Sequence, residues 1–431
     1  MREMKDSGET WIGEIPEAWR LEILKNSLKQ INEPNSPIKT TSVLSLTNKL
    51  GVVPFEEKGD QGNKAKENYE EYKLAYPNTL VVNSMNVLIG SVGISRFFGC
   101  VSPVYYVFHE VEGKSDLRFV NYVFQIPGFQ KELRRYANGI LEIRLRISSY
   151  DLLHRPIPFP PLYEQSRISD FLDVKCAEID TILENTRASI EEYKKLKQSV
   201  ITEAVTKGIC GERPMKDSGV EWIGEIPAEW RISRVGLHFS IILGKMLCSE
   251  QLDESYSLEK YFCAADVHFS GVSYDGLKKM WFSPTEKTLY KVFNGDLLVV
   301  EGGAGAGGAA VASGVIEDIF IQNSIMIVRP MAHNSVTYLK YLLESLVGRG
   351  YVDFACNKAT IPHFTKDKLG QVPFPLPSTV EQKEIAAYLD EKCAAIDGLI
   401  ASKESLITEL ETYKKSIIYE YVTGKKEVPA V

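Results

Sequence analysis

The stretch "EQSRISDFLDVKCAEIDTILENTRASIEEYKKLKQSVITEAVT", residues 164–206, decides the fold. Its apolar residues recur at steps of three and four, and no proline interrupts them, which predicts one long amphipathic helix. A second version, "EQKEIAAYLDEKCAAIDGLIASKESLITELETYKKSIIYEYVT", occupies residues 381–423 and aligns with the first without a gap. The chain therefore contains the same long helix twice.

Each predicted helix has a single apolar seam, with a spacing close to that of a coiled coil. A helix of this kind needs a partner along its length, and we expect the two copies to pair with each other. At a rise of about 1.5 Å per residue, each would span roughly 65 Å. The alternative is two separate amphipathic helices, each packed on its neighbouring globular part. The predicted seam includes Ile168, Leu172, Ile179, Ile190, Ile385, Leu389, Ile396 and Leu410.

A second repeated motif, which we call the tag, precedes each half of the chain. It reads "MKDSGETWIGEIPEAWR" at residues 4–20 and "MKDSGVEWIGEIPAEWR" at residues 215–231. A repeat this distant indicates duplication of a whole module rather than a solenoid. The sequence thus predicts six segments: a tag at 1–20, a variable domain at 21–157, a helical spacer at 158–210, a second tag at 211–231, a second variable domain at 232–372, and a second spacer at 373–431.

The two variable domains do not resemble each other in sequence. Each alternates strand-forming residues with Gly, Asn and Ser turns, as in "NTLVVNSMNVLIGSVGISRFFGC" and "GDLLVVEGGAGAGGAAVASGVIEDIFIQNSIMIVRP". Each also contains short amphipathic helices. We therefore predict an α+β fold: two domains of mixed character joined by two long helices, with a pseudo-two-fold internal repeat.

Composition excludes several classes of protein. The chain has 431 residues, of which 44% are hydrophobic and 25% charged, and no apolar run long enough to span a membrane. The start is polar and unlike a signal peptide. Seven scattered cysteines are typical of reduced thiols, so we expect a cytoplasmic protein without disulfides or a zinc site.

Catalytic motifs are missing, and we predict no catalysis by this chain and no cofactor or metal of its own. The glycine run "EGGAGAGGAA" at residues 301–310 lacks the Lys and Ser/Thr of a phosphate loop, and the residues after it resemble a strand rather than a helix. A tight turn of small residues is the main interpretation; a close backbone approach to DNA is the second.

Net charge is −7, but the excess of negative charge lies mainly in the tags and helical spacers, and the variable domains are near neutral. Basic and polar side chains in the variable domains are candidates for contact with phosphates and base edges. Each also has a turn-forming or solvated-surface interpretation. The candidates are Asn83, Ser84, Asn86, Arg96, Arg134, Arg135, Arg144 and Arg146 in the first domain, and Lys278, Lys279, Asn323, Lys358, Thr360 and His363 in the second.

Taken together, these features resemble the DNA specificity subunits of type I restriction–modification systems. The resemblance covers nearly the whole chain. It lies in the duplicated "WIGEIP" tag, the "PFP" and "EQ" steps before each long helix, the helix endings "KQSVITEAVTKG" and "KKSIIYEYVTGK", and the dissimilar domains between them.

The resemblance implies that each variable domain is a target-recognition domain reading one half of a split sequence in double-stranded DNA. It implies that the helices pair as an antiparallel coil acting as spacer. The implied partners are two modification subunits, which methylate adenine, and ATP-dependent restriction subunits that translocate and cleave DNA. S-adenosylmethionine, ATP and Mg²⁺ would then belong to those partners.

Other functions remain open on the sequence. One is a coiled-coil scaffold that binds proteins without DNA specificity; another is the specificity partner of a separate methyltransferase-only system. An orphan nuclease is a third. We also expect Trp11, Trp19, Trp222 and Trp230 to anchor each tag where its recognition domain meets the helices, although they could simply fill small cores.

Overall fold

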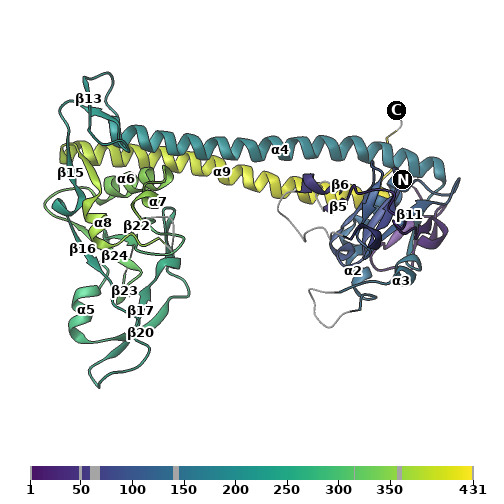
Figure 1. Ribbon diagram of the computed structural model, residues 1–431, viewed down its shortest axis with the longest axis horizontal. Helices are drawn as coiled ribbons and strands as arrows, with labels where there is room; N and C mark the ends of the chain where they lie inside the picture. Colours follow the sequence, from purple (N-terminus) through teal and green to yellow (C-terminus); the bar gives the residue numbers. More distant parts are fainter. Residues whose placement is uncertain are drawn as a thin grey trace. The chain divides into compact units, whose positions relative to one another are not determined.

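The computed structural model describes residues 2–47, 51–58, 68–138, 145–314, 316–356 and 362–429. The chain forms two compact units. Unit 1 combines residues 1–187 with residues 404–431, and unit 2 is the continuous segment 188–403. Each unit holds one tag, one variable domain (hereafter recognition domain, the name that the resemblance gives it) and parts of both long helices (Figure 1). The six-segment division of the sequence stays a prediction at the level of its boundaries.

Helix α4 (Leu162–Lys207) and helix α9 (Thr379–Val422) are the two predicted long helices. Neither contains an internal proline, and each follows a proline-containing strand. Each ends at a glycine with positive φ, Gly208 at 76° and Gly424 at 73°. A left-handed glycine after the last turn is a common helix stop. Both helices therefore begin after a proline-containing strand and end before a glycine, although the two glycines are one position apart in the repeat.

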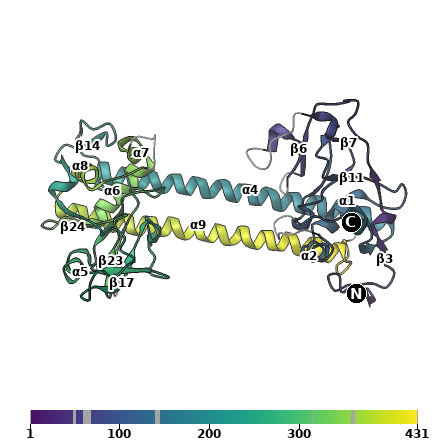
Figure 2. The same cartoon turned by 60° about the horizontal axis from the view of Figure 1, so that its bottom comes forward.

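The two helices run antiparallel within each unit (Figures 1 and 2). In unit 1, Asp180 of α4 pairs with Lys414 of α9 at 2.6 Å, and further along α4 Arg187 pairs with Glu411 at 2.7 Å. In unit 2, Lys197 of α4 pairs with Asp397 of α9 at 2.7 Å. In the repeat, Lys197 aligns with Lys414 and Asp397 with Asp180, so this is the Asp180–Lys414 pair with the two helices exchanged. These exposed ion pairs add little stability, but they show the register.

The predicted seam residues are buried, apart from Leu410, which is partly buried against the unit 1 core. The alternative of helices packed on the globular parts is also realised, because the helix ends enter the domain cores. Ile168 and Leu172 share an apolar cluster with the sheet and helices of the first recognition domain. Ile385 and Leu389 do the same in unit 2. Paired coil and domain core are thus continuous.

Unit 1 begins with the tag hairpin of β1 (Met4–Asp6) and β2 (Glu14–Pro16), which are antiparallel. Strands β3 (Arg20–Ile23) and β12 (Pro156–Phe159) pair and bring the two ends of the recognition domain together. Its main sheet has the order β4 (Leu28–Ile31), β11 (Tyr105–Glu110), β8 (Leu80–Asn83), β9 (Val92–Ile94). The other strand pairs are β5 (Leu44–Thr47) with β6 (Gly51–Pro54) and β7 (Lys73–Ala75) with β10 (Gly99–Val101).

The helices of the first recognition domain are short. They are α1 (Leu117–Phe124), α2 (Pro127–Arg134) and α3 (Ser149–Leu153), with the 3-10 turns η1 (Leu24–Asn26), η2 (Phe55–Lys58), η3 (Tyr69–Glu71) and η4 (Val87–Ile89).

Unit 2 repeats the frame with β13 (Met215–Asp217), β14 (Glu225–Pro227), and the closing pair β15 (Arg231–Arg234) and β25 (Pro373–Leu376). Its main sheet has the order β16 (Phe239–Leu243), β24 (Ile325–Pro330), β21 (Leu297–Val300), β22 (Ala309–Val311). In both units the sheet is antiparallel, and its strands follow the same order: first, last, second, third. The two recognition domains therefore share a topology that their sequences do not reveal.

The second recognition domain also contains a three-stranded sheet. Its order is β20 (Lys278–Phe282), β17 (Ser257–Phe262), β23 (Ile319–Ile321), and β18 (Val267–His268) and β19 (Gly271–Val272) form a separate small hairpin. The remaining elements are α5 (Pro284–Tyr290), α6 (Val336–Gly348), α7 (Tyr351–Ala355), α8 (Lys366–Gln371), η6 (Val235–Leu237) and η7 (Ala264–Asp266). The prediction of an α+β fold with two domains and two paired long helices is confirmed.

Candidate functional site

Several of the DNA-contact candidates of the first domain gather around the turn η4. Asn86 is exposed there. The backbone N–H of Ile147 donates to the Ser84 carbonyl at 3.1 Å, which brings exposed Arg146 beside this turn. Helix α2, which carries Arg134, also contacts this turn. Arg135 follows α2 and is exposed, with its guanidinium 2.9 Å from Glu132.

Arg96 does not belong to this group. The β8–β9 pairing places Leu80 opposite Ile94 and Val82 opposite Val92. Arg96 therefore lies at the opposite end of the hairpin from Asn86, although it is exposed. Arg144 lies outside the described residues.

Two candidates, Asn83 and Ser84, are buried and already engaged. The Asn83 Oδ1 accepts the backbone N–H of Met85 at 3.1 Å, and the Ser84 hydroxyl donates to the Val104 carbonyl at 2.6 Å. Ser84 has no exposed surface and Asn83 only 5%. Both side chains stabilise the turn after β8, which was the competing interpretation of their sequence, and neither can reach a base from this position.

In the second domain, Asn323 and His363 lie around Glu301. The Nδ1 atom of His363 is 3.2 Å from the Glu301 Oε2, and the Glu301 N–H donates to the carbonyl of Ser324 next to Asn323. His363 is exposed, and Asn323 is half-buried, with its Oδ1 accepting from Gln322. The backbone N–H of Gln322 donates to the Phe262 carbonyl at 3.1 Å, which joins this turn to the end of β17.

Lys278 lies opposite Tyr261 in the β17–β20 pairing, so it is at the same end of the sheet as the turn at Asn323. Lys279 is one residue further along β20, opposite Lys260, and both Lys278 and Lys279 are exposed. Lys358 and Thr360 lie outside the described residues.

The glycine run forms the hairpin loop between β21 and β22. A Cβ atom on Gly307 would come within 2.7 Å of the Val352 side chain, so this glycine allows the loop to pack closely on α7. No helix follows the run, which confirms the turn interpretation and removes the structural context of a dinucleotide site.

The two tryptophans of each tag make different contacts, one with a long helix and the other with the recognition domain. The indole N–H of Trp19 donates to Glu164 at 2.9 Å, and that of Trp230 donates to Glu381 at 2.8 Å. Both glutamates lie in the first turn of a long helix. The other tryptophan of each tag contacts its recognition domain: Trp11 packs on Phe129 and Trp222 on Phe354.

An arginine completes each tag contact. Arg213 forms an ion pair with Glu381 at 2.7 Å, and its guanidinium lies 5.0 Å from the centre of the Trp230 ring. Arg2 occupies the equivalent place in unit 1, paired with Glu164 and 5.8 Å from the Trp19 ring. Opposite charge and a cation–π contact hold the tag against the helix.

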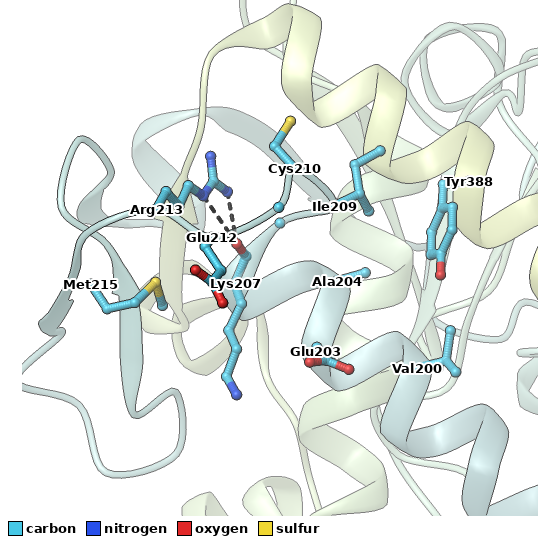
Figure 3. A pocket seen from close by; sticks show the side chains of 12 residues that line it. Val200, Glu203, Ala204, Lys207, Ile209, Cys210, Glu212, Arg213, Met215 and Tyr388 are labelled. Atoms are coloured by element: carbon cyan, nitrogen blue, oxygen red, sulfur yellow. Dashed lines mark hydrogen bonds between the residues drawn. The ribbon is translucent and has the colours of Figure 1, made fainter.

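The two frames differ in how the end of one long helix packs on the other. A groove of about 700 Å³ lies beside the end of α4 in unit 2 (Figure 3). Ala204 and Tyr388 face it from the two long helices. The aligned residues of unit 1 are Tyr421 and Phe171, whose ring centres are 4.5 Å apart. A tyrosine thus fills in unit 1 the space that an alanine leaves open in unit 2.

Residues 275–412 match the model of the type I restriction modification DNA specificity domain. A putative type I restriction enzyme specificity subunit of Methanocaldococcus jannaschii, MjaX, is 25% identical over 97% of this chain and 96% of its own length. Over nearly its whole length, the chain is therefore similar to type I specificity subunits.

A further curated relative and two solved structures are also similar to this chain. The MjaVIII subunit of the same organism is 26% identical over 63% of this chain and 62% of its own. Among solved structures, a chain from work on assembly and conformational transition of a type I R-M system has a TM-score of 0.73 at 17% identity, covering 96% of this chain and 99% of that one. The HsdS subunit of Thermoanaerobacter tengcongensis has a TM-score of 0.54 at 17% identity, covering 96% and 98%. These two likenesses concern the fold.

The curated relatives are named as specificity subunits of type I restriction enzymes. Within the described ranges, no group of three or more histidine, cysteine, aspartate or glutamate side chains is placed to hold a metal ion. Of the helices that the structure describes, none combines the length and apolar character needed to cross a membrane.

Sequence reasoning noted the Glu-Gln step before each long helix but gave its side chains no role. The signal was present, since Glu164 and Gln165 recur as Glu381 and Gln382 in identical positions of the repeat. What it could not supply was the partner of each side chain, because those partners lie far away in the sequence.

Proposed function

We propose that this chain reads a bipartite DNA sequence and directs the modification and restriction subunits of a type I system to it. The observation that carries the proposal is the repetition of one frame around two domains with the same sheet order and different exposed residues. A repeated frame gives two equivalent attachments, and different exposed edges allow two different half-sites to be read.

In the first domain, the proposed reading surface is the group around η4: Asn86, Arg134, Arg135 and Arg146, with Arg144 as a further member outside the described residues. Arg96, at the other end of the hairpin, would contact the phosphate backbone separately. Asn83 and Ser84 are left out because their side chains are buried and bonded within the turn.

In the second domain, the proposed surface comprises Lys278, Lys279, Asn323 and His363 at one end of the β20–β17–β23 sheet, together with Lys358 and Thr360. Asparagine and basic side chains are the types that read base edges and phosphates.

The proposed partners are two modification subunits, which supply S-adenosylmethionine-dependent adenine methylation, and restriction subunits that use ATP and Mg²⁺. Assembly would take place in the cytoplasm. The duplicated tag contacts support equivalent docking of two modification subunits, one for each frame.

The test is single-molecule sequencing with adenine-methylation detection. DNA would come from cells expressing this chain with its neighbouring modification subunit, and from cells lacking this chain. We expect a split motif with a constant gap, methylated only when the chain is present. A verified complex that leaves no chain-dependent motif would contradict the proposal and favour a protein-binding scaffold.

A further inference from the structure

Each long helix reaches into its recognition domain through a glutamine. Gln165 is fully buried, and its Oε1 accepts the backbone N–H of Asp116 at 2.9 Å. Asp116 is the N-cap residue of α1. In unit 2, the buried Gln382 accepts the backbone N–H of Ser335 at 2.9 Å, and Ser335 is the N-cap residue of α6. The two recognition domains are therefore held by the same atoms of the frame.

The other end of each glutamine amide is also bonded. The Gln165 Nε2 donates to the Pro160 carbonyl at 2.9 Å, and the Gln382 Nε2 donates to the Pro377 carbonyl at 3.2 Å. These prolines belong to the step that leads into each helix. The amide is thus clamped between the helix start and the recognition domain, which fixes its orientation.

A second contact lies two turns further along each long helix. The Tyr122 hydroxyl of α1 donates to Asp173 at 2.7 Å, and the Tyr341 hydroxyl of α6 donates to Asp390 at 2.7 Å. Burial raises the pKa of both tyrosines well above the ordinary value, so each hydroxyl remains a donor.

These two contacts recur with the same spacing in domains of unrelated sequence. In α1 and α6 alike, the tyrosine follows the N-cap residue by the same number of positions, and the aspartate follows the glutamine likewise. One contact would let the short helix pivot on the long one. Two contacts, at separate points along both helices, prevent that rotation.

We propose that these contacts are two domain joints, Gln165–Asp116 with Tyr122–Asp173 and Gln382–Ser335 with Tyr341–Asp390, which fix the angle between each recognition domain and its long helix and so restrict the gap accepted between half-sites. The proposal rests on the function proposed above. In it, Gln165, Gln382, Tyr122 and Tyr341 are positioning residues that contact no base.

The test compares the unaltered complex with one carrying Gln382→Ala and Tyr341→Phe. Both would be assayed for methylation of DNA whose gap is the native one, or one base pair shorter or longer. We expect the preference for the native gap to fall by about tenfold, since the lost hydrogen bonds no longer hold the angle. The half-sites themselves should still be required.

A stability-matched control separates positioning from folding. Phe320→Leu alters a buried residue of the same domain away from the joint. It should lower methylation at every gap in the same proportion and leave the preference unchanged. Tyr341→Phe alone, which retains the ring, should have an intermediate effect on gap preference.

A second measurement does not depend on DNA. Spin labels carried by non-natural amino acids at Glu391 of α9 and Lys279 of β20, both exposed in unit 2, would report the angle as a distance distribution. We expect a broader distribution in the double variant than in Phe320→Leu.

The outcomes are distinguishable. Unchanged gap preference and an unchanged distance distribution, in a complex that methylates its split motif, would overturn the joints alone. A broadened distribution with unchanged gap preference would overturn their effect on the gap. If the unaltered complex methylates no split motif, the proposed function fails, and the part of this proposal that concerns the gap fails with it.

Discussion

At the scale of single residues, the turn after β8 contains polar side chains that can serve two different roles. Asn83 and Ser84 are residue types that read DNA, but they are also residue types that form turns. In the folded chain the turn prevails, because Asn83 ends a fully buried strand, Ser84 follows it directly, and both side chains satisfy backbone groups. Nothing in the local sequence distinguishes them from exposed Asn86, which lies in the same turn.

Arg146 offers a direct test of the proposed reading surface. We expect Arg146→Ala to weaken DNA binding by the assembled complex about 5- to 20-fold and to reduce the salt dependence of the affinity by about one ion if it contacts a phosphate. Binding would be measured by fluorescence anisotropy over a range of salt concentrations.

The matched control is Lys195→Ala, which removes an exposed positive charge from α4 outside the recognition domains. It should leave both quantities unchanged. Equal losses in the two variants would indicate a general effect of charge and argue against a surface around η4.

Thiol reactivity tests burial independently of DNA. Burial raises the pKa of Cys100 to about 11, and this cysteine has no exposed surface. At pH 8 it therefore has neither a reactive thiolate nor access to reagent. Cys210 is exposed beside the unit 2 groove. We expect iodoacetamide to modify Cys210 first and to spare Cys100 in the native chain, as followed by peptide mass spectrometry; similar rates would contradict this placement.

At the scale of elements, the long helices were predictable and the sheets were not. Apolar periodicity and the proline steps indicated α4 and α9, because helical contacts are local in sequence. Strand alternation indicated that strands exist, but the order in a sheet depends on partners far apart in the chain. Val82, for example, pairs with Tyr106 in β11 and Val92 in β9, and only the second is a near neighbour.

Tyr421 and Ala204 occupy equivalent positions of the two long helices, and substituting them should have effects of different size. The space beside the helix is filled by the ring of Tyr421 in unit 1 and is open beside Ala204 in unit 2. Tyr421→Ala removes a 9% exposed ring that packs on Phe171, and should lower the free energy of unfolding by about 3 kcal/mol. Ala204→Tyr places the same ring into the open groove and should change it by less than about 1.5 kcal/mol.

Urea denaturation of the two variants and the unaltered chain would measure both values. A large loss from Ala204→Tyr would mean that the groove cannot receive the ring, and that the two helix ends are not equivalent in the way their alignment implies.

At the scale of the whole molecule, two recognition domains with one topology and one kind of attachment should be exchangeable. A chain in which residues 232–372 also replace residues 21–157 retains both frames. We expect its complex to methylate a target built from two copies of the second half-site and to ignore the native target. Sequencing with adenine-methylation detection would identify the motif.

The unaltered complex serves as the reference for that exchange, and the hybrid must first be shown to fold and to bind the modification subunit. A folded, assembled hybrid that still methylates the native motif would mean that the exchanged segment does not determine the first half-site.

The discontinuity of unit 1 has a consequence for synthesis on the ribosome. Domains usually fold in the order in which they emerge. Here the core of unit 1 includes Ile417, Ile418, Tyr421 and Val422, which are translated after the whole of unit 2. Unit 2 is continuous, so it can be completed first. The first recognition domain must therefore wait, with part of its apolar surface uncovered, until the second half of α9 has been made and packs on it.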